Sequence, residues 1–343
     1  MRAAVLKDWK QIEIRDIAAP QPGPGEVLID VAYTGICGSD VHIYNGHNPI
    51  ARTPVVLGHE FTGRVAVLGY GVKGLSTNIR AVVQPLESCG DCTPCRRGSP
   101  HVCESLIVIG VNQDGAFAEQ AVVPADCVFP IPDDLADETA ALAEPFSIAT
   151  HSLTRGRISA ADRVLVIGAG PIGLYCALTA RYMGAQTVHV SEPNPQRREM
   201  ATKFGVASTD PTQEDAKESL AAASQGEGFD LVVETSGVRA GFDFAIEAAA
   251  VQGHLVLLGF PSGGTADIPI TRCILKELEL IGSRVCTRAE FQKTLDMLTA
   301  MQSGGEIDFG SLIAGARPLE DLDRAIHDVA NSAENAKTLI KPV

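Results

Sequence analysis

Residues 163–173 read R-V-L-V-I-G-A-G-P-I-G, and this stretch decides how the middle of the chain folds. The apolar run V-L-V-I is typical of a buried parallel strand, and a helical pattern begins at Pro171. Gly168 allows a tight turn, Gly170 lets backbone approach a pyrophosphate, and Gly173 lets the helix pack against its strand. The stretch therefore predicts a dinucleotide site at the start of a helix, with an ordinary strand–turn–helix junction as the simpler alternative.

An acidic residue ends the next predicted strand, T-V-H-V-S-E at residues 187–192. A carboxylate here can accept hydrogen bonds from both ribose hydroxyls and would repel a 2′-phosphate, so Glu192 favours NAD over NADP. Arg197 and Arg198 follow closely and could bind a phosphate, which leaves NADP open; their simpler role is a solvated first helical turn. The expected cofactor-binding residues are Gly168, Gly170, Pro171, Ile172, Gly173, Glu192 and Arg197.

The pattern around this stretch predicts an α/β chain with one domain inserted in another. From about Ser159 onward, apolar strands alternate with helical segments, as in a doubly wound parallel sheet covered on both faces. The residues before it form short strands punctuated by Gly and Pro, and two amphipathic helices and a closing strand come after it. We expect a mostly β domain over 1–150, the parallel sheet over 151–285, and a return to the first domain over 286–343.

Four cysteines lie close together at residues 89–103, C-G-D-C-T-P-C-R-R-G-S-P-H-V-C. Their C-x2-C-x2-C-x7-C spacing suits a tetrahedral zinc site with no position left for a substrate, which makes it structural. An iron–sulfur cluster, or two disulfides in a secreted protein, would also fit the spacing. We expect zinc, bound by Cys89, Cys92, Cys95 and Cys103.

A second group of metal-type ligands lies in three short motifs of the first domain. One thiolate, one imidazole and one or two carboxylates form a more open site than four thiolates, with room for water or an alcohol. Zinc in such a site lowers the pKa of a bound hydroxyl. Taken singly, each residue has a simpler role, such as a buried cysteine, a core histidine or a surface acid. The candidates are Cys37, Ser39, Asp40, His42, His59, Glu60 and Glu144.

The composition argues against nucleic-acid and membrane partners. The 343 residues carry a formal net charge of −14, which disfavours binding to phosphate backbones. The start, M-R-A-A-V-L-K-D-W-K, lacks a signal-peptide pattern, and no apolar run approaches the ~20 residues that span a bilayer. We therefore expect a cytoplasmic protein, whose nine cysteines serve metal binding or core packing in a reducing compartment.

Together these motifs resemble the zinc-containing medium-chain alcohol dehydrogenases, in particular the polyol, threonine and sugar-acid branch that includes sorbitol dehydrogenase. The resemblance covers almost the whole chain. Besides the cysteine loop and the glycine turn, it rests on G-I-C-G-S-D-V-H at 35–42, G-H-E-F-T-G at 58–63, A-E-P at 143–145 and V-E-T-S-G at 233–237. It implies a Rossmann domain inserted in a GroES-like catalytic domain, an active site in the cleft between them, and a homo-oligomer, either tetramer or dimer.

The resemblance also implies roles for the candidate residues. Cys37, His59 and Glu60 would bind a catalytic zinc, and Glu144 would be a fourth ligand or hold a water; which glutamate binds directly stays open. Ser39 and His42 would relay the proton. The implied reaction is zinc-dependent hydride transfer from a secondary alcohol (a polyol, sugar acid or hydroxy-amino acid) to NAD. The alternatives are an NADPH-dependent carbonyl reductase of the same family and a non-catalytic dinucleotide sensor.

Several positions depart from the family pattern or carry no motif. Residues 76–83, S-T-N-I-R-A-V-V, replace a Gly-Asp-x-Val turn that usually leads into a strand. Tyr44, Phe117 and an arginine, Arg284 or Arg288, are candidates to face the substrate. An edge strand near residues 267–270 is the segment that we expect to pair with a second copy.

Overall fold

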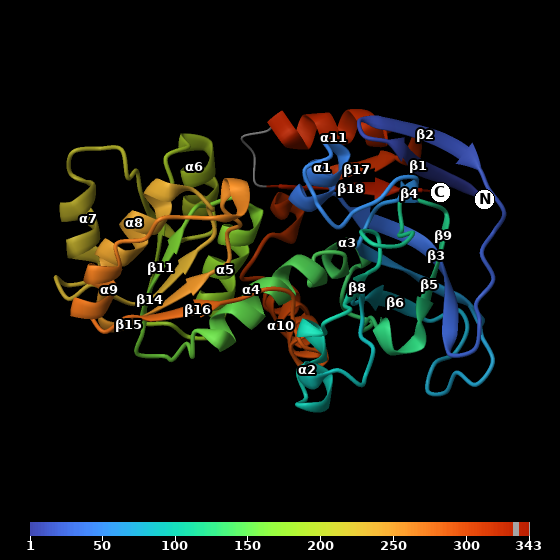
Figure 1. The fold of residues 1–343 in the computed structure, drawn as a ribbon, viewed down its shortest axis with the longest axis horizontal. Coiled ribbons are helices and arrows are strands. Elements are labelled where there is room, and N and C mark those ends of the chain that lie inside the picture. Colours follow the sequence, from blue (N-terminus) through green and yellow to red (C-terminus); the bar gives the residue numbers. More distant parts are fainter. Residues whose placement is uncertain (332–335, 343) are drawn as a thin grey trace. The chain divides into compact units, whose positions relative to one another are not determined.

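The computed structural model describes residues 1–331 and 336–342, and these divide into two compact units (Figure 1). The first unit contains residues 1–144, 287–331 and 336–342, so both ends of the chain belong to it; the second contains residues 145–286. None of the described helices has the length and the apolar composition that a membrane crossing requires.

The first unit is built around strand β3 (Glu26–Gly35), which pairs with three other strands. These are β5 (Glu60–Leu68), β9 (Gln120–Pro124) and the last strand of the chain, β18 (Lys337–Lys341). The remaining strands are β1 (Arg2–Asp8), β2 (Gln11–Asp16), β4 (Val55–Val56), β6 (Arg80–Val83), β7 (Leu86–Glu87), β8 (Ile107–Val108), β10 (Val128–Pro130) and β17 (Ile313–Pro318). The pairing of β3 with β18 is antiparallel and sets Gly35 opposite Leu339.

The first unit also contains five helices and four 3-10 turns among its described residues. The longest, α10 (Arg288–Gly304), begins with a capping box in which Thr287 and Glu290 bond each other's backbone N–H, and it ends at Gly305 in the left-handed conformation. The others are α1 (Gly38–Tyr44), α2 (Thr93–Arg96), α3 (Asp137–Ala140) and α11 (Leu322–Asn331), with 3-10 turns at η1 (Pro100–Val102), η2 (Ala125–Cys127), η4 (Phe309–Leu312) and η5 (Leu319–Asp321). Helix α4 (Ala143–Arg155) continues the chain into the second unit.

The second unit is a six-stranded parallel sheet in the order β13-β12-β11-β14-β15-β16. Its strands are β11 (Arg163–Ile167), β12 (Thr187–Ser191), β13 (Ala207–Thr209), β14 (Phe229–Glu234), β15 (Ala249–Leu257) and β16 (Glu279–Gly282). The helices are α5 (Pro171–Tyr182), α6 (Pro195–Lys203), α7 (Ala216–Ala223), α8 (Arg239–Ala248) and α9 (Ile270–Leu275), with a 3-10 turn at η3 (Ser262–Gly264). This strand order confirms the predicted doubly wound fold.

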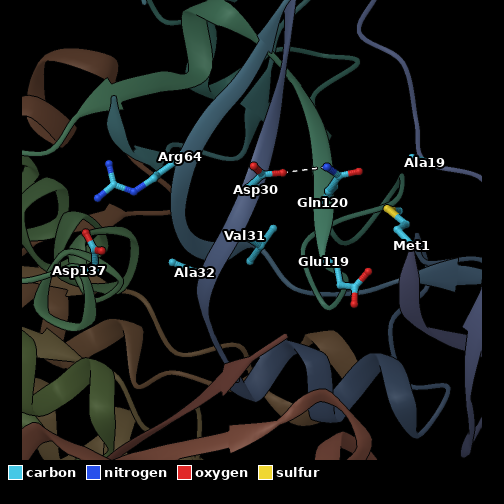
Figure 2. Close-up of a pocket in the computed structure, with 9 residues that line it drawn as sticks. All are labelled: Met1, Ala19, Asp30, Val31, Ala32, Arg64, Glu119, Gln120 and Asp137. Atoms are coloured by element: carbon cyan, nitrogen blue, oxygen red, sulfur yellow. Dashed lines mark hydrogen bonds between the residues drawn. The ribbon is translucent and has the colours of Figure 1, made fainter. Parts of the chain in front are cut away.

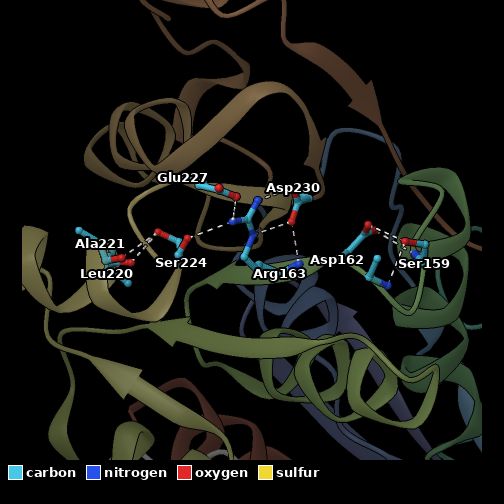
Figure 3. Close-up of polar contacts among 9 residues, drawn as sticks. Ser159, Asp162, Arg163, Leu220, Ala221, Ser224, Glu227 and Asp230 are labelled. Carbon is cyan, nitrogen blue, oxygen red and sulfur yellow. Dashed lines mark hydrogen bonds and ion pairs between the residues drawn. The ribbon is translucent and has the colours of Figure 1, made fainter.

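Two central strands of this sheet are joined at their N-terminal ends by a partly buried ion pair (Figure 3). Arg163, which starts β11, donates to both carboxylate oxygens of Asp230 on β14 at 2.8 Å and also binds Glu227 at 2.6 Å. Arginine and carboxylate geometries match in such two-bond contacts. The pair therefore fixes β11 beside β14 at the end opposite to the glycine turn.

The structure explains one departure from the family pattern and corrects one prediction. Asn78 has φ 66, the left-handed conformation that a glycine would supply, and β6 starts two residues later. The predicted edge strand near residues 267–270 is wrong, because Ile270 begins helix α9 directly after Pro269. Proline lacks the N–H that a strand needs and suits the start of a helix. The strand at this edge of the sheet is β16.

A buried histidine makes the stability of the second unit sensitive to acid. His189 lies on β12 with its Nε2 2.7 Å from the hydroxyl of Thr209. Burial lowers the pKa of His189 from 6.5 to about 4, because the charged imidazolium would lose its hydration. Between these two values the unfolded chain binds a proton that the folded chain does not.

We predict that lowering the pH from 7 to 4.5 destabilises the wild type more than a His189→Gln variant. The histidine contributes at most about 3 kcal/mol to this loss, which begins near pH 6.5 and is complete near pH 4. Melting temperatures of both proteins, measured at the two pH values, give the comparison. Equal losses in wild type and variant would contradict a neutral buried His189.

Candidate active site and metal centres

Three of the candidate ligands meet in the first unit. Cys37 is the N-cap of α1, His59 directly precedes β5, and Glu60 is the first residue of β5. Their ligand atoms all lie within 4.8 Å of one another. The backbone next to His59 packs closely against Phe117, and this requires a glycine at position 58. Gly58 has φ 98, and a Cβ there would lie 2.9 Å from the backbone nitrogen of Phe117. A soft thiolate, an imidazole and a carboxylate in this arrangement fit a zinc ion.

Negative groups surround the imidazole of His59. Asp40 is buried, with one carboxylate oxygen 3.5 Å from His59 Nδ1 and the other accepting the backbone N–H of Cys37 at 2.8 Å. Ser39 Oγ lies 3.3 Å from His59 Nε2. Burial lowers the pKa of His59, but Asp40 and Cys37 outweigh this and raise the pKa well above its usual value. The surroundings therefore favour a cation at this point.

The carboxylate of Glu60 is held by a buried lysine. Lys337, the first residue of β18, places its Nζ 2.9 Å from Oε1 and 2.7 Å from Oε2 of Glu60, and it also donates to the carbonyl of Ile36 at 3.2 Å. The space for this pair exists because residue 35 is glycine. A Cβ on Gly35 would lie 2.4 Å from Glu60 Oε2 and 3.3 Å from Lys337 Cδ.

Glu144 lies near this group, in the first turn of α4. Burial raises the pKa of its carboxyl to about 7, and the charges of His59, Glu60, Lys337 and Asp40 also act on it. A nearby cation, such as a metal ion, would stabilise the charged form of this buried carboxylate. The structure thus brings Cys37, Ser39, His59, Glu60 and Glu144 to one region, whereas His42 lies exposed on α1.

The four cysteines of residues 89–103 form a second centre. The sulfur of Cys92 lies 3.3 Å from that of Cys95 and 3.7 Å from that of Cys103, which lies 3.5 Å from that of Cys89. Zinc–sulfur bonds of about 2.3 Å in a tetrahedron place the sulfurs about 3.8 Å apart. The described distances therefore fit a single ion, and all four residues are free cysteines.

The predicted cofactor residues meet at the glycine turn of the second unit. Glu192 is buried and accepts the N–H of Ala169 at 2.7 Å and that of Asn194 at 2.8 Å. Arg197 reaches over the turn, with its Nη1 4.0 Å from the position of a Cβ on Gly170.

Close packing at this turn explains why residue 173 is a glycine. Gly173 lies so near the strand end that a Cβ there would be 2.0 Å from the carbonyl oxygen of Gly168. The second arginine near the turn, Arg198, has a structural role rather than facing the turn. It donates to the carbonyl of Glu192 at 2.8 Å and pairs with Asp210 at 3.1 Å.

A hollow of about 600 Å³ on the first unit is unrelated to these centres (Figure 2). It lies beside β3 and β9, where Asp30 accepts a hydrogen bond from Gln120 at 2.7 Å. None of the predicted site residues lines it; the lining residues are Met1, Ala19, Asp30, Val31, Ala32, Arg64, Glu119, Gln120 and Asp137.

Comparisons with known proteins agree with the two units. Residues 23–133 match the family of the alcohol dehydrogenase GroES-like domain, and residues 171–300 match that of the zinc-binding dehydrogenases. The chain is 34% identical over 342 residues to 2-dehydro-3-deoxy-L-galactonate 5-dehydrogenase of Pseudoalteromonas atlantica, covering 99% of this chain and 98% of that protein. It is 35% identical over 339 residues to L-threonine 3-dehydrogenase of Photorhabdus laumondii, covering 98% and 97%. The chain belongs to the zinc-binding alcohol dehydrogenases.

Solved structures agree with this family. An alcohol dehydrogenase from E. coli CFT073, in complex with NADH, matches with a TM-score of 0.91 at 33% identity, over 100% of this chain and 99% of that one. A zinc-binding dehydrogenase from Sinorhizobium meliloti, bound to NADP, matches with a TM-score of 0.89 at 31% identity, over 99% of both chains. These findings confirm the predicted family, its polyol and threonine branch, and the GroES-like and Rossmann fold classes.

Three residues that the sequence suggested for substrate contact have structural roles in this dehydrogenase. Tyr44 and Phe117 are buried in one hydrophobic core cluster, and the Tyr44 hydroxyl donates to Asp323 at 2.9 Å. The guanidinium of Arg288 lies 4.3 Å from the centre of the Phe129 ring. Conversely, Lys337 belongs to the site although no motif marks it; its one signal in the sequence is a lysine at the start of an apolar closing strand.

We predict that Gly35→Ala disrupts the candidate metal centre of Cys37, His59 and Glu60 while sparing the cysteine centre. The new Cβ would displace the Glu60 carboxylate and break its pair with Lys337, at a cost of about 3–5 kcal/mol. Zinc analysis should show close to one zinc per chain instead of two, with a lower melting temperature.

A matched control is Gly38→Ala, since no atom lies within 4 Å of a Cβ at that position. This variant should keep the zinc content and melting temperature of the wild type. Full zinc occupancy and an unchanged melting temperature in Gly35→Ala would show that the glycine is not required.

Proposed function

We propose that this protein oxidises a secondary alcohol and transfers the hydride to NAD in a zinc-dependent reaction. The observation that carries the proposal is the meeting of Cys37, His59 and Glu60 within 4.8 Å in a chain of the zinc-binding dehydrogenase family. The proposed catalytic domain, over 1–150 and 286–343, would correspond to the first unit, and the dinucleotide-binding domain, over 151–285, to the second, whose bounds are 145–286. All nine cysteines are free, which supports a cytoplasmic location.

Cys37 and His59, with Glu60 or Glu144, would hold the catalytic zinc, and the four clustered cysteines would hold the structural one. Zinc in the open site would supply a Lewis acid for the substrate hydroxyl. Asp40 orients the His59 ring through Nδ1, which leaves Nε2 for the metal. Lys337 holds Glu60 in place and offsets one negative charge of the site.

The proton would leave through side chains of helix α1. Ser39 Oγ, 3.3 Å from His59 Nε2, lies beside the candidate metal ligands, where it would accept the substrate proton while it passes its own proton to a ribose hydroxyl of the cofactor. His42 lies three residues later on the same helix and is exposed. An imidazole in contact with water can pass the proton to solvent, so we assign His42 the last step of the relay.

The cofactor is best explained as NAD. Both oxygens of Glu192 accept backbone N–H bonds, which leaves lone pairs for ribose hydroxyls and a negative charge that opposes a 2′-phosphate. Arg197, placed over the glycine turn, would contact the pyrophosphate or the ribose. The NADP-bound relative and this arginine keep an NADPH-dependent carbonyl reductase as the second candidate.

The substrate would be a small hydroxylated molecule. Two of the matching relatives are named for L-threonine and for 2-dehydro-3-deoxy-L-galactonate. We therefore place polyols, sugar acids and hydroxy-amino acids first among the candidates.

The deciding experiment measures NAD and NADP reduction by zinc-loaded protein over a panel of polyols, sugar acids and L-threonine. We expect turnover with NAD on one class, loss of activity on chelation and recovery with zinc. Cys37→Ser should lower kcat/KM by about a thousandfold or more, because the variant loses a metal ligand. Cys127→Ser, a buried cysteine outside both centres, is the control and should retain activity. Near-wild-type turnover in Cys37→Ser would refute the assignment.

We also propose that the protein is a homo-oligomer, a tetramer or a dimer, that associates through the second unit. Helix α9 exposes Ile270, Ile274 and Leu275, with Leu275 76% exposed, and β16 is an edge strand. Exposed apolar side chains beside an open strand edge are typical of subunit interfaces.

Replacing Ile274 and Leu275 by Lys and Glu should therefore shift the protein to monomers. Light scattering gives the molar mass, and Tyr70→Lys, which changes an exposed side chain of the first unit, should leave it unchanged. An unaltered molar mass in the double variant would show that the interface lies elsewhere. A monomeric wild type would refute the proposed homo-oligomer.

A further inference from the structure

The last residue of β14 is a fully buried glutamate that the proposed mechanism does not use. Glu234 ends β14 and has no exposed surface. Its Oε1 accepts the N–H of Ser236 at 2.9 Å and that of Gly237 at 3.0 Å, and it also accepts the Ser236 hydroxyl. Burial raises the pKa of Glu234, and these donors partly offset that effect. The carboxylate of Glu234 therefore holds the turn formed by residues 235–237.

The same residue connects the turn to the next strand. Its backbone carbonyl accepts the N–H of Leu258 at 3.0 Å and that of Gly259 at 2.9 Å, directly after β15. A Cβ on Gly259 would lie 2.7 Å from Glu234 Oε2, and one on Gly237 would lie 2.5 Å from the carbonyl of Phe260. The carboxylate therefore fills the space between the two strand ends.

The neighbouring threonine connects the turn to the glycine-rich segment. Thr235 donates its backbone N–H to the Ile167 carbonyl at 3.0 Å and its hydroxyl to the same oxygen at 2.8 Å. The hydroxyl also lies 3.3 Å from the carbonyl oxygen of Gly168. A Cβ on Gly173 would lie 2.9 Å from this hydroxyl. The turn after β14 thus packs directly against the glycine turn.

We propose that Glu234 is a positioning residue for the dinucleotide, acting through the turn 235–237. Ligands of open parallel sheets bind beyond the carboxyl ends of the strands. The Glu234 carboxylate orders the turn 235–237 through Ser236 and Gly237. The backbone carbonyl of the same residue joins this turn to the segment after β15, and Thr235 joins it to the end of β11, so the ordered turn connects three strand ends. By occupying the N–H groups of Ser236 and Gly237, the carboxylate also leaves the glycine turn as the amide donor for the pyrophosphate. This inference rests on the proposed function.

The test compares Glu234→Gln with Asp230→Asn, a variant at the opposite end of the same strand. Asp230 pairs with Arg163, the first residue of β11 (Figure 3), whereas the glycine turn follows the last residue of that strand. The Kd for NADH, obtained by fluorescence titration of the zinc-loaded protein, is measured together with the melting temperature. We expect Glu234→Gln to raise the Kd about tenfold, because the NH2 group that replaces Oε2 would oppose the N–H of Gly237, which Oε2 accepts at 3.2 Å. Asp230→Asn should lower the melting temperature but change the Kd less than about twofold.

Each outcome has one meaning. An unchanged Kd in Glu234→Gln would overturn the inference, and so would an equal rise in Asp230→Asn, since the effect would then be general destabilisation. If Glu234→Gln does not fold, Thr235→Val decides: a raised Kd supports the inference and a wild-type Kd rejects it. Failure of the wild type to bind NADH or NADPH would instead contradict the proposed function.

Discussion

The candidate active site depends on the pairing of the last strand with an early one. Strand β18 lies antiparallel to β3, which brings Lys337 to Glu60, 277 positions away in the sequence. A glutamate buried without a partner would be strongly disfavoured, and the lysine removes this penalty. The pairing of β3 with β5 sets Gly35 opposite Glu60, so that the glycine leaves room for the pair. Two strand pairings that share β3 thus fix the carboxylate whose neighbours are Cys37 and His59.

Close backbone approach has the corresponding role in the second unit. The glycine turn, the turn after β14 and the segment after β15 pack so tightly that side chains at Gly173, Gly237 and Gly259 would overlap neighbouring atoms. Two buried carboxylates of this region are satisfied within the protein: Glu192 by two backbone N–H groups and Glu234 by the turn that follows it. Contacts within the protein therefore hold the carboxyl edge of the sheet together without a ligand.

Much of this could be predicted from the sequence because the main motifs are local. The order of strand, glycine turn and helix at 163–173 and the cysteine spacing at 89–103 depend on residues a few positions apart, and both fold as predicted. Lys337 could not be assigned, because its partner is fixed by a long-range strand pairing. Tyr44 and Phe117 resembled pocket residues because a core aromatic and a substrate-facing one have the same local pattern. At Asn78 the sequence departed from a familiar turn, yet asparagine adopts the same left-handed backbone.

The position of β18 after the whole parallel sheet in the sequence also sets an order of assembly during synthesis. The parallel sheet, through residue 282, emerges from the ribosome before Lys337–Lys341. Until these residues emerge, Thr34 and Gly35 of β3 lack their partners on β18, and Glu60 lacks its lysine. The parallel sheet can therefore form first, whereas the site around Glu60 is assembled only after β18 has paired with β3.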